Sequence, residues 1–261
     1  MKQKIYQVDA FAEQLFSGNP AAVCPLDHWL EDDLLQKIAM ENNLAETAYF
    51  VPAGDQFQLR WFTPTTEVDL CGHATLASAY VLFHQLGYGK KVINFHSPRS
   101  GALSVTKEDG FLTLDFPADT ITEVSATPDL TNGLNILPGK VFKGKTDYML
   151  VYEHEDQIKN IIPDFAAIHA IKARGIIVTA RGKDVDFVSR FFAPQSGVNE
   201  DPVTGSAHTT LTPFWSRMLN KQVLTAKQLS ARGGFLKCSH LGERVKISGQ
   251  GRLYLEGEIF I

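Results

Sequence analysis

The chain has 261 residues, 44% of them hydrophobic and 21% charged, which is enough to bury one large core or two smaller ones. The formal charge of −4 is small and the Lys and Arg residues are spread out, so no nucleic-acid or membrane partner is indicated. The sequence shows no bilayer-spanning apolar run, no signal peptide and only three scattered cysteines, so we expect a soluble protein of the reducing cytoplasm.

In chain order, short β-branched or aromatic runs predict strands in the first half, at residues 5–11, 47–51, 57–62, 92–96, 102–105 and 111–116. Residues 28–40 have the spacing of an amphipathic helix. Residues 74–83 are apolar almost all round, which predicts a helix buried on every side, as inside a curled sheet. The second half repeats this scheme, with strands at 148–151, 176–179, 187–192, 235–239 and 252–261 and a helix at 206–219.

Three separated blocks of the first half recur in the second. Residues 60–64 (RWFTP) return as 190–194 (RFFAP), a shift of 130, whereas Gly72 meets Gly205 at a shift of 133. Residues 97–101 meet 230–234 at that same shift. We therefore predict two similar domains, 1–118 and 119–261, in which the last strand, 252–261, can pack with the first half. Facing halves would bring the loops before Gly72 and Gly205 to one cleft.

In the first half, chemistry-bearing residues gather at two places. Glu46 opens an apolar strand, where poor solvation suits a carboxylate to general acid/base work, although a surface Glu at a strand end is the more ordinary reading. Gly72 and His73 begin the buried helix, whose N–H groups suit a substrate carboxylate. The helix start should keep His73 neutral and lower the pKa of the Cys71 thiol. A structural role for either side chain stays open, Cys71 as a small buried hydrophobe.

The second half supplies a counterpart at residues 199–208. Gly205 begins another helix, Asp201 adds an acid and Ser206 adds a hydroxyl, although ordinary N-capping by Thr204 or Ser206 is the alternative. Gly18-Asn19-Pro20 is a turn signal first, and Asn19 becomes a substrate contact only if this turn lies near the cleft.

Together these blocks resemble the signatures of the phenazine-biosynthesis (PhzF-like) isomerase family, over nearly the whole chain and in the expected order. The matching blocks are residues 18–23 (GNPAAV), 44–48 (LAETA), 71–77 (CGHATLA), 200–208 (EDPVTGSAH) and 228–234 (QLSARGG). The resemblance implies an α+β, diaminopimelate-epimerase-like fold: two similar domains, each a curled, mostly antiparallel, barrel-like sheet around a central helix. It also implies a homodimer, no metal and no organic cofactor.

The same resemblance implies roles for individual residues. Glu46 would shuttle a proton on a small, carboxylate-bearing anionic metabolite, and His73, Asp201 and Ser206 would line the catalytic site. The predicted substrate contacts are Asn19, Gly72, Ala74, Thr204 and Gly205, mainly through backbone N–H groups near the two glycines.

Three other functions are less consistent with these residues than the isomerase. Proline-racemase and diaminopimelate-epimerase enzymes use two cysteines; Cys71 sits where one would be, but the matching position in the second half is Thr204. A two-base racemase or epimerase is therefore the weaker hypothesis. A non-catalytic small-ligand-binding protein is the alternative from another class, and the intact acid/base residues argue against it. A hydrolase built on Ser206 and His208 lacks the Gly-x-Ser-x-Gly turn.

Overall fold

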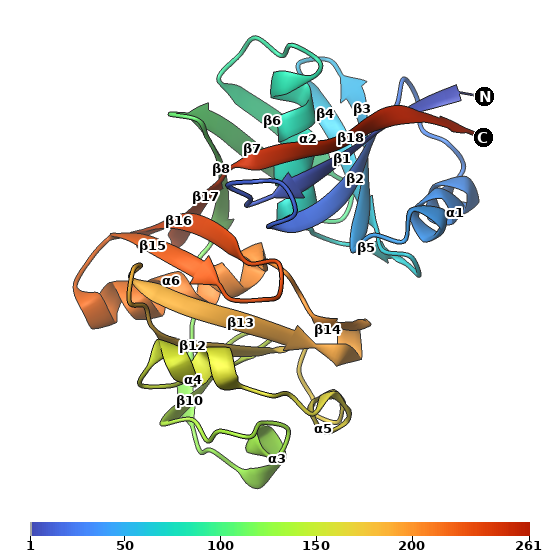
Figure 1. Ribbon diagram of the computed structural model, residues 1–261. Helices are drawn as coiled ribbons and strands as arrows, with labels where there is room; N and C mark the ends of the chain where they lie inside the picture. The colour runs from blue at the N-terminus through green and yellow to red at the C-terminus, as the bar shows by residue number, and fades with distance from the viewer. Residues whose placement is uncertain (1) are drawn as a thin grey trace. The chain divides into compact units, whose positions relative to one another are not determined.

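The computed structural model describes residues 2–261 and has an α+β fold dominated by curled, unclosed sheet (Figure 1). The chain separates into two compact units. Unit 1 contains the residues up to Asp115 together with Ser248–Ile261, and unit 2 is Phe116–Ile247. The division lies close to the predicted one after residue 118. No helix within residues 2–261 is long and apolar enough to cross a membrane.

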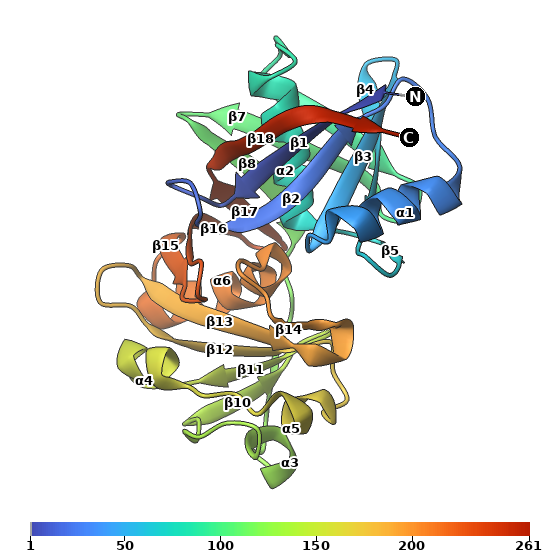
Figure 2. The same ribbon diagram turned by 45° about the vertical axis from the view of Figure 1, so that its right-hand side comes forward.

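Unit 1 is built mainly of strands, with two helices. Its strands are β1 (Lys2–Ala10), β2 (Asn19–Pro25), β3 (Glu46–Ala53), β4 (Gln56–Phe62), β5 (Glu67–Val68), β6 (Val92–Ser97), β7 (Gly101–Glu108), β8 (Phe111–Pro117, ending just past the unit boundary) and β18 (Gly251–Phe260), and its helices are α1 (Asp32–Asn42) and α2 (Gly72–His84). The C-terminal strand β18 runs antiparallel along β1, so the two ends of the chain lie side by side in both views (Figures 1 and 2).

Unit 2 also combines strands with a long helix. Its elements are β9 (Thr122–Val124), α3 (Pro128–Thr131), β10 (Lys140–Lys143), β11 (Tyr148–Val151), α4 (Glu155–Asn160), α5 (Phe165–His169), β12 (Ile176–Arg181), β13 (Phe187–Ala193), the 3-10 turn η1 (Pro194–Ser196), β14 (Val198–Glu200), α6 (Gly205–Leu219), β15 (Val223–Gln228), β16 (Gly234–Leu241) and β17 (Arg244–Gly249), which leads back into unit 1.

Strand pairing follows the same scheme in both units. In unit 1, β1–β2, β3–β4, β4–β5 and β6–β7 are antiparallel, whereas β2–β3 and β4–β6 are parallel. In unit 2, β10–β11, β12–β13, β13–β14 and β15–β16 are antiparallel, whereas β11–β12 and β13–β15 are parallel. Helix α2 follows β5 as α6 follows β14. Each unit therefore has the same order and direction of strands around one long helix.

An ion pair repeats with this topology. In unit 1 the guanidinium of Arg60 makes two hydrogen bonds to Glu67, at 2.7 and 3.0 Å, and lies over the ring of Phe62. In unit 2 Arg190 makes the same two bonds to Glu200, at 2.7 and 3.0 Å, over the ring of Phe192. The recurring residues 60–64 and 190–194 thus carry a bidentate brace between neighbouring strands, a geometry that only Arg supplies.

Helix α2 is the buried helix that residues 74–83 predict. It packs against β1, β2 and β3, as both views show (Figures 1 and 2). Its two buried hydroxyls are satisfied within the helix, because Thr75 and Ser78 donate to carbonyl oxygens four residues earlier, at 2.6 and 2.8 Å. Ten of the thirteen residues of α2 are buried, and this packing fixes the helix start within unit 1.

Helix α1 begins four residues later than the spacing predicts, at Asp32 instead of His28. The indole of Trp29 instead donates to Gln58 of β4 at 2.6 Å, and this contact holds the preceding loop on the sheet. Glu31 is then the N-cap, and acidic residues follow in the first turn, where the helix dipole favours them.

Candidate active site

Unit 1 brings two of the predicted catalytic residues together. Glu46 is the first residue of β3 and His73 the second residue of α2. Oε2 of Glu46 lies 3.0 Å from Nε2 of His73, and the side chains are 18% and 7% exposed. Apart from this ion pair, Oε2 is buried without a hydrogen bond from the described residues. The two side chains therefore form a close, largely buried ion pair at the start of α2.

Cys71 and Asn19 surround the other ring nitrogen of His73. Sγ of Cys71, the N-cap residue of α2, lies 3.5 Å from Nδ1 and 3.9 Å from Nε2. The amide nitrogen of Asn19 lies 3.2 Å from Nδ1. Asn19 reaches this position because Gly18 has φ 71°, where any Cβ would collide with the carbonyl oxygen of Ala10. Glu46, Cys71 and His73 each offer one metal-ligand atom, and these atoms all lie within 4.8 Å of one another.

The charge states differ from both sequence-based expectations. Burial raises the pKa of the Cys71 thiol to about 11, and the negative charge of Glu46 adds to this rise. Burial by itself lowers the pKa of His73, but the contacts with Cys71 and Glu46 outweigh it and raise this pKa well above its ordinary value. The predictions of an acidic thiol and a neutral imidazole are therefore wrong. Burial is the main cause for the thiol, and the contacts with Cys71 and Glu46 are the cause for the imidazole.

The start of α2 supplies further polar groups. Gly72 is its first residue, and the first N–H groups of any helix lack partners within the helix. The N–H of Ala74 donates to the sulfur of Cys71, and that of Thr75 donates to the Cys71 carbonyl at 3.1 Å. The predicted substrate contacts Asn19, Gly72 and Ala74 thus lie around the same helix start as the Glu46–His73 pair.

In unit 2 the predicted residues Asp201 and Thr204 are joined in one network. The hydroxyl of Thr204, the N-cap residue of α6, donates to Oδ2 of Asp201 at 2.5 Å. The buried side chain of Gln228 accepts from the Thr204 N–H at 2.9 Å and donates to the Asp201 carbonyl at 2.7 Å. Gly205 follows as the first residue of α6. Gln228 therefore fixes the loop that leads into this helix.

Ser206 has a different partner. Its Oγ accepts a hydrogen bond of 2.8 Å from the guanidinium of Arg174, which in turn is paired with the buried carboxylate of Asp147. Because the hydroxyl oxygen already accepts this bond, its hydrogen is left to donate elsewhere. Arg174 therefore fixes the hydroxyl of Ser206, which can still donate a hydrogen bond. This contact is not part of the Asp201–Thr204–Gln228 network.

Sequence reasoning gave no role to Gln228, Arg174 or Asp147. Gln228 does stand in one of the blocks that carry the family resemblance, so a signal was present. Arg174 and Asp147 lie in loops with no recognisable pattern, and only the fold brings them to Ser206.

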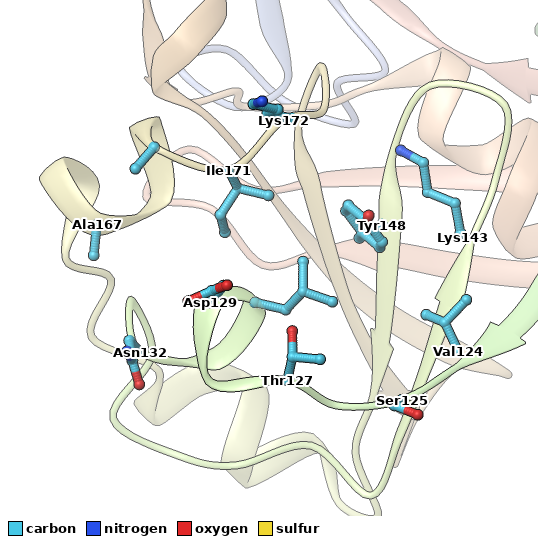
Figure 3. Close-up of a pocket in the computed structure, with 12 residues that line it drawn as sticks. Val124, Ser125, Thr127, Asp129, Asn132, Lys143, Tyr148, Ala167, Ile171 and Lys172 are labelled. Carbon is cyan, nitrogen blue, oxygen red and sulfur yellow. The ribbon is translucent and has the colours of Figure 1, made fainter.

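A pocket of about 690 Å³ also lies in unit 2 (Figure 3). Its lining residues fall between Val124 and Lys172, a stretch that contains none of the predicted site residues. On one side the ammonium of Lys143 lies 4.1 Å from the ring centroid of Tyr148. None of the residues that line this pocket belongs to the polar groups described at the start of α6.

Comparison with known proteins agrees with this arrangement. The model of the phenazine biosynthesis-like protein family (PhzC-PhzF) matches residues 8–257. A protein of Pseudomonas aeruginosa named as an uncharacterized isomerase is 53% identical over 262 residues, covering 100% of both chains. A crystal structure of a phenazine biosynthesis protein of the PhzF family from Enterococcus faecalis is 45% identical and covers 100% of both chains, with a TM-score of 0.97.

A hydroxyproline epimerase from Agrobacterium vitis shares the fold alone, at 10% identity and a TM-score of 0.63, covering 99% of this chain and 92% of that one. The epimerase-like fold and the resemblance drawn from the sequence motifs are thus confirmed. The relatives' names support an isomerase in general. With its motifs, its topology and its relatives in agreement, the chain belongs to the phenazine biosynthesis-like protein family.

Proposed function

We propose that the chain is an isomerase that moves a proton on a small carboxylate-bearing metabolite by general acid/base catalysis, with no metal or organic cofactor in the reaction. The observation that carries this proposal is the pair of Glu46 and His73, 3.0 Å apart at the start of α2. The isomerase name of the Pseudomonas aeruginosa relative supports the reaction class.

Glu46 is the group best suited to move the proton. Isomerisation requires one group that takes a proton from carbon and returns it to another position of the substrate. Oε2 of Glu46 pairs with Nε2 of His73 at 3.0 Å and, among residues 2–261, makes no further hydrogen bond, while the side chain remains 18% exposed. It can therefore take up a substrate proton once this one contact with His73 is exchanged for the substrate.

His73 and the start of α2 would hold the charge that develops. The contacts with Cys71 and Glu46 raise the pKa of His73, which favours the positively charged imidazolium beside Glu46. Both ring nitrogens then donate, so the Asn19 amide would turn its oxygen toward Nδ1. A cation next to the N–H groups of a helix start stabilises a substrate carboxylate, and stabilises an enolate formed from it still more.

The two-thiol racemase lacks support on two counts. Thr204 occupies at α6 the N-cap position that Cys71 occupies at α2, so unit 2 provides a hydroxyl where the second thiol would be. The Cys71 thiol, with its pKa raised to about 11, is also protonated at neutral pH and is a poor base.

Deuterium exchange into substrate tests the proposal. The protein is incubated in D₂O with a panel of small unsaturated and amino carboxylic acids, and exchange at carbon is followed by NMR. Glu46→Gln keeps the shape of the side chain but cannot accept the proton, so exchange should fall by about 10²- to 10⁴-fold. Glu258→Gln, at a surface ion pair with Lys2, is the matched control and should exchange like the wild type.

Two results would count against the assignment. Equal exchange rates in wild type and Glu46→Gln would show that Glu46 is structural. An acid that binds the wild type and never exchanges would favour the non-catalytic binding protein. The predicted participation of Asp201 and Ser206 in the same reaction stays a prediction, and Asp201→Asn and Ser206→Ala in the same assay test it.

A further inference from the structure

We propose that Glu46, Cys71 and His73 form a binding site for a thiophilic divalent cation, best matched by Zn²⁺, which competes with the isomerase reaction. The site offers one sulfur, one ring nitrogen and one carboxylate oxygen, all within 4.8 Å of one another. No part of the proposed reaction uses this ion, so binding would be a property beyond catalysis.

The separations of the three atoms suit a tetrahedral ion. Zn²⁺ lies about 2.3 Å from sulfur and about 2.0–2.2 Å from nitrogen and oxygen, which puts tetrahedral ligand atoms about 3.3–3.6 Å apart. In this structure Nε2 of His73 is 3.0 Å from Oε2 of Glu46 and 3.9 Å from Sγ of Cys71. For these two pairs, shifts of a few tenths of an ångström suffice. Rotation of the side chains must also bring Sγ of Cys71 and Oε2 of Glu46, which lie within 4.8 Å of each other, to this spacing to give the three ligands that open zinc sites use beside a water.

The donor atoms also favour zinc over harder cations. Sulfur and imidazole ligands select zinc and other borderline or soft ions, whereas Mg²⁺ and Ca²⁺ prefer oxygen alone. Oε2 of Glu46, which pairs in this structure with Nε2 of His73, would exchange that contact for a ligand bond. A bound ion displaces the thiol proton of Cys71, since thiols coordinate as thiolates.

Asn19 would act as the outer partner of this site. When Nε2 of His73 binds an ion, the imidazole carries its proton on Nδ1 and needs an acceptor there. The Asn19 amide lies 3.2 Å from Nδ1 and can offer its oxygen. An ion held in this way occupies the oxygen of Glu46 that the proposed proton transfer requires; inhibition therefore rests on the proposed function, whereas ion binding does not.

Binding is measured without any substrate, on the full chain freed of metal by chelation. Co²⁺ is the spectroscopic probe, because a thiolate ligand gives a sulfur-to-cobalt charge-transfer absorption in the near ultraviolet. Zn²⁺ affinity is measured by competition with a chromophoric chelator. We expect the charge-transfer band in the wild type and its loss in Cys71→Ser. Cys24→Ala, which removes a different buried thiol from β2, is the matched control and should keep the band.

The Zn²⁺ affinities of two further variants test the roles of the individual residues. Asn19→Ala should weaken Zn²⁺ binding by about 10- to 100-fold, as loss of an outer partner does, and Glu46→Gln should weaken it by at least as much. Circular dichroism verifies that each variant is folded. A folded wild type without the band, or a band that persists in Cys71→Ser, would overturn the site.

The deuterium-exchange assay separates this proposal from the proposed function. Zn²⁺ should suppress exchange in the wild type, and a chelator should restore it. If the Cys71-dependent band is present and exchange proceeds unchanged with Zn²⁺ bound, the metal site stands and Glu46 is not the base.

Discussion

His208 makes the stability of unit 2 depend on pH. It lies in α6, fully buried, and Nδ1 is 2.8 Å from the carbonyl oxygen of Thr204, to which it donates. Nε2 is buried and, among residues 2–261, has no hydrogen-bond partner. Burial is the main cause that lowers the pKa of His208, to about 4, because a charged imidazole would lose its hydration.

The size of the effect follows from this pKa. In the unfolded chain a histidine has a pKa of about 6.5. Above pH 6.5 the ring is neutral in both the folded and the unfolded chain, so its titration does not change the free energy of unfolding. As the pH falls from about 6.5 to about 4, the unfolded chain takes up a proton that the folded chain refuses, so stability falls. At about 1.4 kcal/mol for each pH unit, the loss amounts to about 3 kcal/mol by pH 4.

The repeat supplies the substitution that tests this. In α2 the position equivalent to His208 is Thr75, whose hydroxyl donates to the N-cap carbonyl of Cys71 at 2.6 Å. His208→Thr should therefore keep the corresponding bond to Thr204 and remove the titrating ring. The lost ring volume should cost about 0.5–3 kcal/mol at every pH.

The assay is urea unfolding between pH 4 and 8, followed by circular dichroism and tryptophan fluorescence, whose coincidence checks for a single transition. On lowering the pH from 7 to 4, the wild type should lose about 3 kcal/mol more than His208→Thr does. His28→Thr, at an exposed turn, is the control and should follow the wild type. An unfolding free-energy difference between wild type and His208→Thr that does not change with pH would show that the ring is solvated or partnered, and would refute the reasoning.

Two further predictions concern the polar groups at the two helix starts. The thiol of Cys71 should react slowly with iodoacetamide at pH 7, as measured by peptide mass spectrometry. Glu46→Gln should speed this reaction, because it removes a negative charge that raises the thiol pKa. An unchanged rate in this variant would contradict that cause. Gln228→Leu should lower the free energy of unfolding by about 1–3 kcal/mol, because the Thr204 N–H and the Asp201 carbonyl lose their buried partner. A neutral result in urea unfolding would mean that water replaces the amide.

Much of the architecture could be predicted from the sequence alone. The constant offsets between residues 60–64 and 190–194, and between Gly72 and Gly205, indicated a duplication, and the strand pairings follow one order in both units. The composition of residues 74–83 indicated the buried helix α2. These features can be recognised in the sequence because burial imposes a pattern of apolar residues along the chain itself. The first residue of α1 could not be predicted from the sequence, because a contact of Trp29 with the distant strand β4 determines where this helix begins.

At the candidate site, too, the sequence determined some features and the tertiary structure determined others. Motifs selected Glu46, His73 and Asn19, but not the distances between them or their partners, since β2, β3 and α2 bring together residues far apart in the chain. The local argument from the helix start gave the wrong charge state for His73 and for Cys71. A helix dipole is a property of neighbouring residues, whereas the burial of the thiol and the contact of the imidazole with Glu46 depend on the packing of other strands around the helix start. Sequence thus determined which groups are present and on which elements, and the tertiary structure alone decided which charges meet, because electrostatic energies depend on separation in space and on burial.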